Sequence, residues 1–210
     1  ENHYYSYISN LRNRIFFALN TYDYFPLIVL EKQYSNTAYI NYYINTASET
    51  EAAKFYKEEL SNVINTKEDF NLLQLARKWN KLHPEKKVTV GCHDLEWNYR
   101  STLRKIILPY IKKFDNKFSI DVEGLNNKKL GKLIPVLRQE LNQIQKKNST
   151  GKYPFITLNY ITTVIDNLVS TYNSNYYEGF PISFYRQKAM IRNLTQKSFL
   201  GKYLSRGKIV

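Results

Sequence analysis

Cysteine, histidine and long apolar runs are all scarce in this chain. The single cysteine, Cys92, excludes an internal disulfide, and three scattered histidines cannot form the Cys/His clusters of zinc fingers. No apolar run approaches the roughly 18 residues that a membrane-spanning helix needs, and no segment has the pattern of a signal peptide. We therefore expect no zinc-knuckle, redox or membrane-spanning function. A cytoplasmic location and export after loss of a leader both stay open.

The chain has enough apolar residues to bury one core. Its 210 residues are 43% hydrophobic, and no internal repeat is evident. We expect a single domain over residues 1–210, with a helical subdomain within about 98–180.

Positive charge is concentrated in the second half. The net charge is +13, yet residues 1–100 hold 12 Lys/Arg against 12 Asp/Glu, whereas residues 101–210 hold 19 against 6. Solvated helix faces account for such an excess, and an anionic ligand, a membrane surface or nucleic acid would also fit it. Only the charge favours a nucleic-acid-binding helical protein, whose binding affinity would depend steeply on salt concentration. We therefore do not expect nucleic acid to be a partner.

The apolar pattern predicts helices separated by buried strands. Apolar residues recur every three or four positions over 3–20, which indicates an amphipathic helix. The runs "LIVLE" and "KKVTVGCHD" are typical of buried strands, and "RGKIV" resembles the start of another. Thr66 is a candidate helix cap, and His83-Pro84 should end the helix that follows it. Further helices are predicted at about 34–45, 48–65, 67–82, 98–114, 128–147, 155–173 and 184–204.

Polar residues follow the predicted strands. Strands separated by helices indicate an α/β fold, with a parallel or mixed central sheet flanked by many helices and a helix-rich second half. Glu31 ends the first strand, and His93 and Asp94 end the second. Glu1 and His3 lie before the first helix, where a preceding strand would end. Because ligands of open α/β sheets bind outside the carboxyl ends of strands, we expect His3, Glu31 and Asp94 to open onto one cleft.

These residue types favour acid/base chemistry, but each also has a structural explanation. A histidine beside a carboxylate can take a proton from water, so His3 and Glu31 are a candidate pair. His3 can equally be a hydrogen-bonded surface residue, and Glu31 can form a structural salt bridge. His93 fits a loop histidine, and Asp94 can cap a helix. Cys92 fits a small buried residue better than a nucleophile.

Five segments in order resemble the erythromycin-esterase-like family, which is related in fold to the ChaN and TraB/Tiki groups. They are "ENH", "LRNR", "FPLIVLE", "VGCHDLE" and "YRQKAMIRNL", and together they span nearly the whole chain. The family has a Gly-Glu-x-His segment after its first strand, then a Leu-Arg pair, a Glu and an Asp at two strand ends, and an Arg-Asp pair followed by Met and Asn. The matching positions here are Glu1, His3, Leu11, Arg12, Glu31, Asp94, Arg186, Met190 and Asn193.

The resemblance implies a hydrolase for a small-molecule ester. His3 would activate water, Glu31 would orient or assist it, and Arg12 and Arg186 would hold substrate or support the carboxylates. Spacing does not itself bring Arg12 to His3, because nine residues place it on the opposite helix face. Glu1, His93, Asp94 and Asn193 would bind substrate or support the site, with no metal or cofactor required. The alternative is a non-catalytic binding domain for haem or another anionic ligand.

The chain also departs from the family pattern. Gln187 stands where the family has Asp, and Cys92-His93 precedes Asp94 in place of the usual residues. The family continues with a further strand and a histidine, whereas this sequence stops at "GKIV". We therefore expect the 210-residue chain to have negligible esterase activity by itself and a form extended at both ends to be active.

Overall fold

The computed structural model describes residues 6–23, 26–64, 66–144, 156–176 and 182–195. Within them the chain forms two compact units, which we describe separately. The first contains residues 6–30 and 36–91, and the second contains residues 31–35 and 92–195. The predicted strand at "RGKIV" lies outside the described residues.

Two parallel strands form the sheet in the described part of the chain. Strand β1 (Leu27–Gln33) pairs with strand β2 (Thr89–Asp94). Thr89 N–H donates to Pro26 O at one end of the pair, and Tyr34 N–H donates to Asp94 O at the other. With helices on either side in the sequence, these strands confirm the predicted α/β class, and the second half is helix-rich as expected.

The first unit packs four helices and the starts of both strands. Its helices are α1 (Ser6–Tyr22), α2 (Asn36–Asn45), α3 (Glu49–Phe55) and α4 (Lys67–Leu82). A π-helical turn (Tyr56–Leu60) extends α3, and a 3₁₀ turn (Pro84–Lys86) follows α4. Helix α4 packs against α2 and α1. The core includes Leu27, Leu30, Ile40, Ile44, Leu72, Leu73, Val88 and Val90.

Local signals set the bounds of α4. The Thr66 hydroxyl accepts from Asp69 N–H at 3.1 Å, and the helix ends at Leu82 before His83 and Pro84. The predicted cap and bounds are confirmed. Two asparagine amides from the helices then satisfy the backbone at the start of β2. Asn80 bonds to both N–H and C=O of Val88, just before the strand, and Asn41 does the same for Val90 within it.

Helix α1 buries a different face from the one its apolar pattern suggests. Leu11, Ile15 and Leu19 are all exposed, whereas Phe16 and its polar neighbours Asn13 and Asn20 are buried. The buried amides have backbone partners, since Asn13 donates to Glu68 O and Asn20 donates to Phe16 O. Burying these amides is therefore tolerated, and packing against α4 overrides the apolar pattern.

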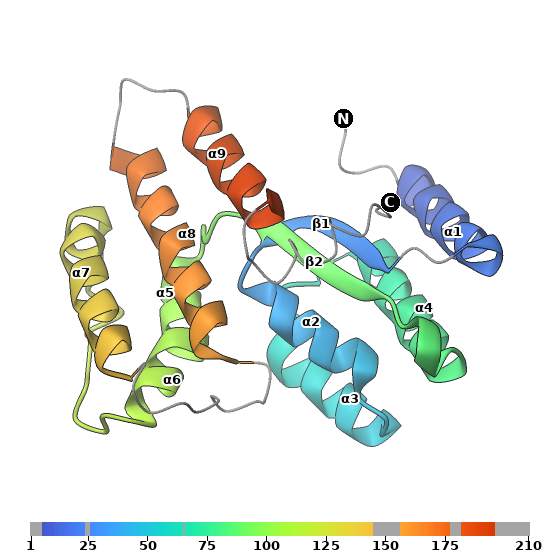
Figure 1. Ribbon diagram of the computed structural model, residues 1–210, viewed down its shortest axis with the longest axis horizontal. Helices are drawn as coiled ribbons and strands as arrows, with labels where there is room; N and C mark the ends of the chain where they lie inside the picture. Colours follow the sequence, from blue (N-terminus) through green and yellow to red (C-terminus); the bar gives the residue numbers. More distant parts are fainter. Residues whose placement is uncertain (1–5, 24–25, 65, 145–155, 177–181, 196–210) are drawn as a thin grey trace. The chain divides into compact units, whose positions relative to one another are not determined.

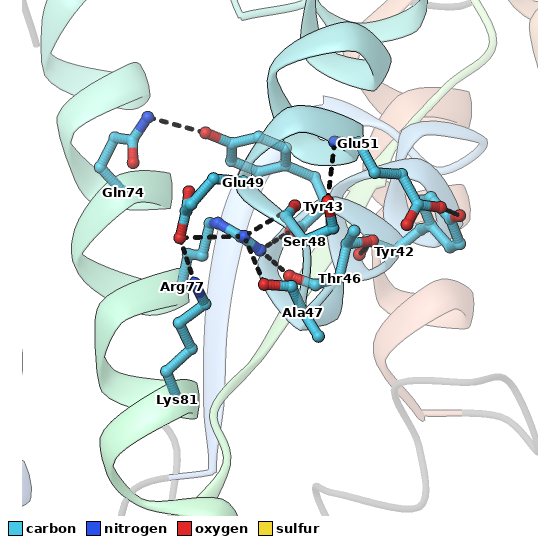
Figure 2. Close-up of polar contacts among 10 residues, drawn as sticks. All are labelled: Tyr42, Tyr43, Thr46, Ala47, Ser48, Glu49, Glu51, Gln74, Arg77 and Lys81. Carbon is cyan, nitrogen blue, oxygen red and sulfur yellow. Dashed lines mark hydrogen bonds and ion pairs between the residues drawn. The ribbon is translucent and has the colours of Figure 1, made fainter.

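Arg77 of α4 joins α4 to the end of α2. Its side chain is 3% exposed. Its guanidinium donates to the carbonyl oxygens of Tyr43, Thr46, Ala47 and Ser48 (Figure 2). A cation at this position donates to carbonyls that the helix end leaves unpaired, and it interacts favourably with the helix dipole.

The second unit is mostly helical. A helical stretch begins with α5 (Tyr99–Thr102), passes through a π-helical segment (Leu103–Ile107) and ends with α6 (Leu108–Lys112). Sequence periodicity predicted one regular helix here. Pro109 explains the difference: it has no N–H to give the carbonyl four residues earlier, and Leu108 N–H instead bonds to Leu103 O, five residues back.

Three long helices complete the second unit. They are α7 (Asn127–Ile144), α8 (Leu158–Tyr176) and α9 (Ile182–Thr195), and α8 packs against both others (Figure 1). The described bounds at 127, 176 and 182 lie within three residues of the predicted ones, whereas the predicted bounds at 147, 155 and 204 lie outside the described residues. The predicted single domain with a helical subdomain stays a prediction. Among the described residues, no helix is long and apolar enough to cross a membrane.

Gly131 allows α7 to approach α8 closely. A Cβ added at Gly131 would lie 2.6 Å from the Tyr172 ring. We expect Gly131→Ala to destabilise the protein by about 1–3 kcal/mol, because the overpacking outweighs the better helix propensity of alanine. Urea unfolding would measure this. A combined Gly131→Ala/Tyr172→Leu variant should recover part of the loss, and equal stability of the parent and Gly131→Ala would contradict the packing argument.

Candidate active site

Arg186 joins two carboxylates in the second unit. Its Nε lies 2.9 Å from Asp94 Oδ1, and its Nη2 lies 2.9 Å from Asp94 Oδ2, so the pair is bidentate. The same Nη2 also donates to Glu31 Oε1. One guanidinium from α9 therefore links a side chain from β1 with one from β2.

The strands explain why these carboxylates meet. Asp94 is the last residue of β2, whereas Glu31 lies inside β1, which continues for two residues to Gln33. The prediction that Glu31 ends its strand is therefore wrong by two residues. Both side chains nevertheless lie toward the carboxyl ends of parallel strands, and Arg186 brings them together. Arg186 thus contacts two other predicted residues, Glu31 and Asp94, whose roles stay predictions.

The carboxylate of Asp94 is held in its charged form. Burial alone would raise its pKa, but hydrogen bonds from Arg186, Leu95 N–H and Trp97 outweigh burial and lower it. The bonds to Asp94 in turn raise the pKa of Arg186. Asp94 is 7% exposed at its side chain, Arg186 33% and Glu31 44%, so only Asp94 is withdrawn from solvent.

A polar network lies beside this cluster. Asn193 donates to His93 O and to Asn167 Oδ1, both at 3.0 Å. Arg192 Nη2 donates to the same Asn167 oxygen at 2.6 Å. Asn193 therefore fixes the backbone of β2 next to Asp94, and the predicted roles of His93 and Asn193 stay predictions.

Glu96 is a site residue that the sequence reasoning missed. It is fully buried, and its carboxylate accepts from Ser35 N–H at 2.9 Å, Ser35 Oγ at 2.6 Å and Thr102 Oγ1 at 2.9 Å. Its own N–H donates to Thr171 Oγ1. Glu96 thereby connects the segment after β1 with the segment after β2. The sequence signal for its burial is its place in "DLEW", between two apolar residues.

The carboxyl group of Glu96 should make stability depend on pH. Burial raises its pKa from 4.5 to about 7, against the opposing effect of the hydrogen bonds from Ser35 and Thr102, and the charge of Asp94 raises it further. The folded-state pKa of Glu96 lies above its unfolded-state pKa. The stability that protonated Glu96 contributes is therefore fully present below about pH 4.5 and is lost as the pH rises through about 7.

Glu96→Gln should remove this dependence, since glutamine keeps an acceptor for Ser35 N–H but does not ionise. Chemical unfolding at several pH values should show the parent losing stability relative to Glu96→Gln as the pH rises. Parallel pH curves for the two proteins would contradict the assignment.

The positions of Arg12, Glu1 and His3 relative to this cluster are not described. Arg12 belongs to α1 in the first unit, where it donates to Asn13 and lies 3.7 Å from Asp69. Glu1 and His3 lie outside the described residues, so the predicted common cleft stays a prediction. Cys92 is buried and is not part of a disulfide. In the described part of the chain, no three His, Cys, Asp or Glu side chains are grouped so that they could hold a metal ion.

The comparisons with known proteins give one structural likeness. No protein-family model matches the chain, and no curated protein matches it. The chain is similar in structure to a succinoglycan biosynthesis protein. The TM-score is 0.53 at 15% identity, over 87% of this chain and 48% of that protein. The chain thus spans about half the length of that protein. At this identity the likeness shows the fold alone, and it supports the α/β arrangement found here.

Proposed function

We propose that this chain is part of an erythromycin-esterase-like hydrolase that cleaves a small-molecule carboxylic ester. The proposal rests on the order of family-like motifs in the sequence. The observation that carries it is the Arg186 bridge, which holds Glu31 and Asp94 together toward the carboxyl ends of parallel strands. Ligands of α/β folds bind in this position.

In the proposed reaction, water attacks the ester carbonyl carbon. His3 takes the proton from the attacking water, and Glu31 orients the water or the imidazole. The carbonyl carbon–alkoxy oxygen bond then breaks, the leaving oxygen takes the proton from His3, and a carboxylic acid and an alcohol are released. Asp94 and Arg186 position Glu31, because Arg186 is fixed bidentately by Asp94 while it donates to Glu31.

A second candidate is a non-catalytic binding domain for haem or another anionic ligand. Arg192 favours it. Within the described residues the Nε of this arginine has no hydrogen-bond partner, and burial lowers the pKa of its guanidinium. A buried guanidinium with an unbonded N–H group would be stabilised by a bound anion that accepts from it.

A thermal-shift screen separates the two candidates, because a ligand stabilises the state that it binds. The full-length protein would be screened with a panel of esters, haem, divalent metals and oligonucleotides, and ester hydrolysis would be followed in parallel. The hydrolase proposal expects turnover of at least one ester. Stabilisation by haem or another anion, with no turnover of any ester, would favour the binding domain instead.

A further inference from the structure

Trp97 is an exposed aromatic side chain that is fixed beside the charged cluster. It is 38% exposed, yet its indole Nε1 donates to Asp94 Oδ2 at 3.3 Å. Arg186 bonds to the same carboxylate. The polar edge of the indole is therefore held at Asp94, while part of its apolar surface stays open to solvent.

The backbone around Trp97 is fixed as well. Asn98 N–H donates to Gln33 Oε1 at 2.5 Å, and Asn98 Oδ1 accepts from Ser101 N–H and so caps α5. The indole is thus held through its own N–H and through the residue that follows it. A ring fixed in this way loses little conformational entropy when a ligand packs on it.

Polar groups of both hydrogen-bonding types accompany the indole. Glu31 is half-exposed and presents carboxylate oxygens that accept hydrogen bonds, and Arg186 is partly exposed and presents N–H groups that donate. Ligand sites commonly combine an apolar surface with a few fixed polar groups of this kind.

We propose that Trp97, Glu31 and Arg186 bind a pyranose-type cyclic polyol, with a C–H face of the ring on the indole and its hydroxyl groups on Glu31 and Arg186. The hydroxyl groups of such a ring both donate and accept, so they match a carboxylate and a guanidinium at once. The proposal deepens the proposed hydrolase function, because it names the alcohol part of the ester.

A neutral ring fits better than a cation. An indole face also attracts cations, but both carboxylates here already bond to Arg186, and the chain carries a net charge of +13. A purely apolar ring fits less well, because it would cover Glu31 and Arg186 without giving them hydrogen bonds.

The two tryptophans of the chain allow a direct test. Protein carrying ¹⁵N-labelled tryptophan gives two indole N–H signals, and Trp79, which belongs to the first unit, serves as the internal control. The 210-residue chain would be titrated with methyl pyranosides up to about 100 mM, a range that covers millimolar dissociation constants. Glucitol, an open-chain polyol, and tetramethylammonium chloride would be titrated in the same way.

We expect at least one pyranoside to move the Trp97 signal saturably, with Trp79 unmoved and with neither control compound acting comparably. Trp97→Ala should weaken pyranoside binding by at least about 10-fold, measured by calorimetry, because the stacking surface is lost. Trp97→Phe, which keeps a ring but lacks the N–H donor, should weaken it less.

Two results would overturn the proposal: no saturable change at Trp97 with any pyranoside, or an equal response to glucitol or tetramethylammonium. The readout is binding, so it is independent of catalysis. A pyranoside that binds, but whose esters are not hydrolysed by the full-length protein, would contradict the hydrolase function and leave the binding site supported.

Discussion

Replacing Arg77 with methionine is expected to lower the free energy of unfolding by about 3–5 kcal/mol, because several carbonyl oxygens lose their donor at about 1–3 kcal/mol for each one left buried and unsatisfied. The guanidinium donates to the carbonyls of Tyr43, Thr46, Ala47 and Ser48 in the first unit (Figure 2). Methionine fills a similar volume but donates nothing, so the end of α2 would lose these hydrogen bonds. Denaturant unfolding monitored by circular dichroism measures the change.

Lys81→Met is the matched control. Lys81 lies one helical turn after Arg77 on α4, is 40% exposed, and pairs with the exposed Glu49. Its removal should leave stability close to that of the parent, because exposed ion pairs contribute little. Equal losses for the two variants would show that the carbonyl contacts of Arg77 do not stabilise the fold.

Arg186→Met is expected to destabilise the protein by about 3 kcal/mol or more at neutral pH, because it leaves the buried carboxylate of Asp94 without its cation. In the parent, the lowered pKa of Asp94 gives stability above the unfolded pKa of about 3.8, and this stability is lost as the pH falls through the folded pKa. In Arg186→Met the pKa of Asp94 should rise, so lowering the pH from neutral should reduce the difference between the variant and the parent.

A double-mutant cycle separates the pair from other effects of the substitution. Arg186→Met/Asp94→Asn should be clearly less destabilised than the sum of its single variants, because the unpaired buried charge is gone. Arg104→Met supplies a matched control, since Arg104 pairs with Glu123 and both are largely exposed. Additive losses in the cycle would contradict a direct Arg186–Asp94 coupling.

Sequence reasoning succeeded where local signals decide the structure. Thr66 and His83-Pro84 mark the ends of α4, and the two apolar runs mark β1 and β2. The rule that parallel strands present their carboxyl ends at one edge then grouped Glu31 with Asp94. These inferences needed no knowledge of which helix packs where.

The misses have tertiary causes. The buried face of α1 depends on its packing against α4, and the periodicity of Leu11, Ile15 and Leu19 cannot show that packing. Glu96 was not singled out by sequence reasoning, because its partners Ser35 and Thr171 lie 61 and 75 residues away in the chain. Such polar clusters become visible only once the helices are placed.

The hydrolysis rate of Glu31→Gln tests the proposed role of the Glu31 carboxylate in ester cleavage. Glutamine keeps an oxygen that can accept from Arg186 but carries no negative charge, so the carboxylate that orients the water or the imidazole of His3 is lost while the fold is retained. In the full-length protein, assayed on its best ester beside His3→Ala, we expect kcat/KM to fall at least about 100-fold with an unchanged melting temperature. A Glu31→Gln variant that melts like the parent and hydrolyses the ester at the parent rate would show that Glu31 has no part in the reaction.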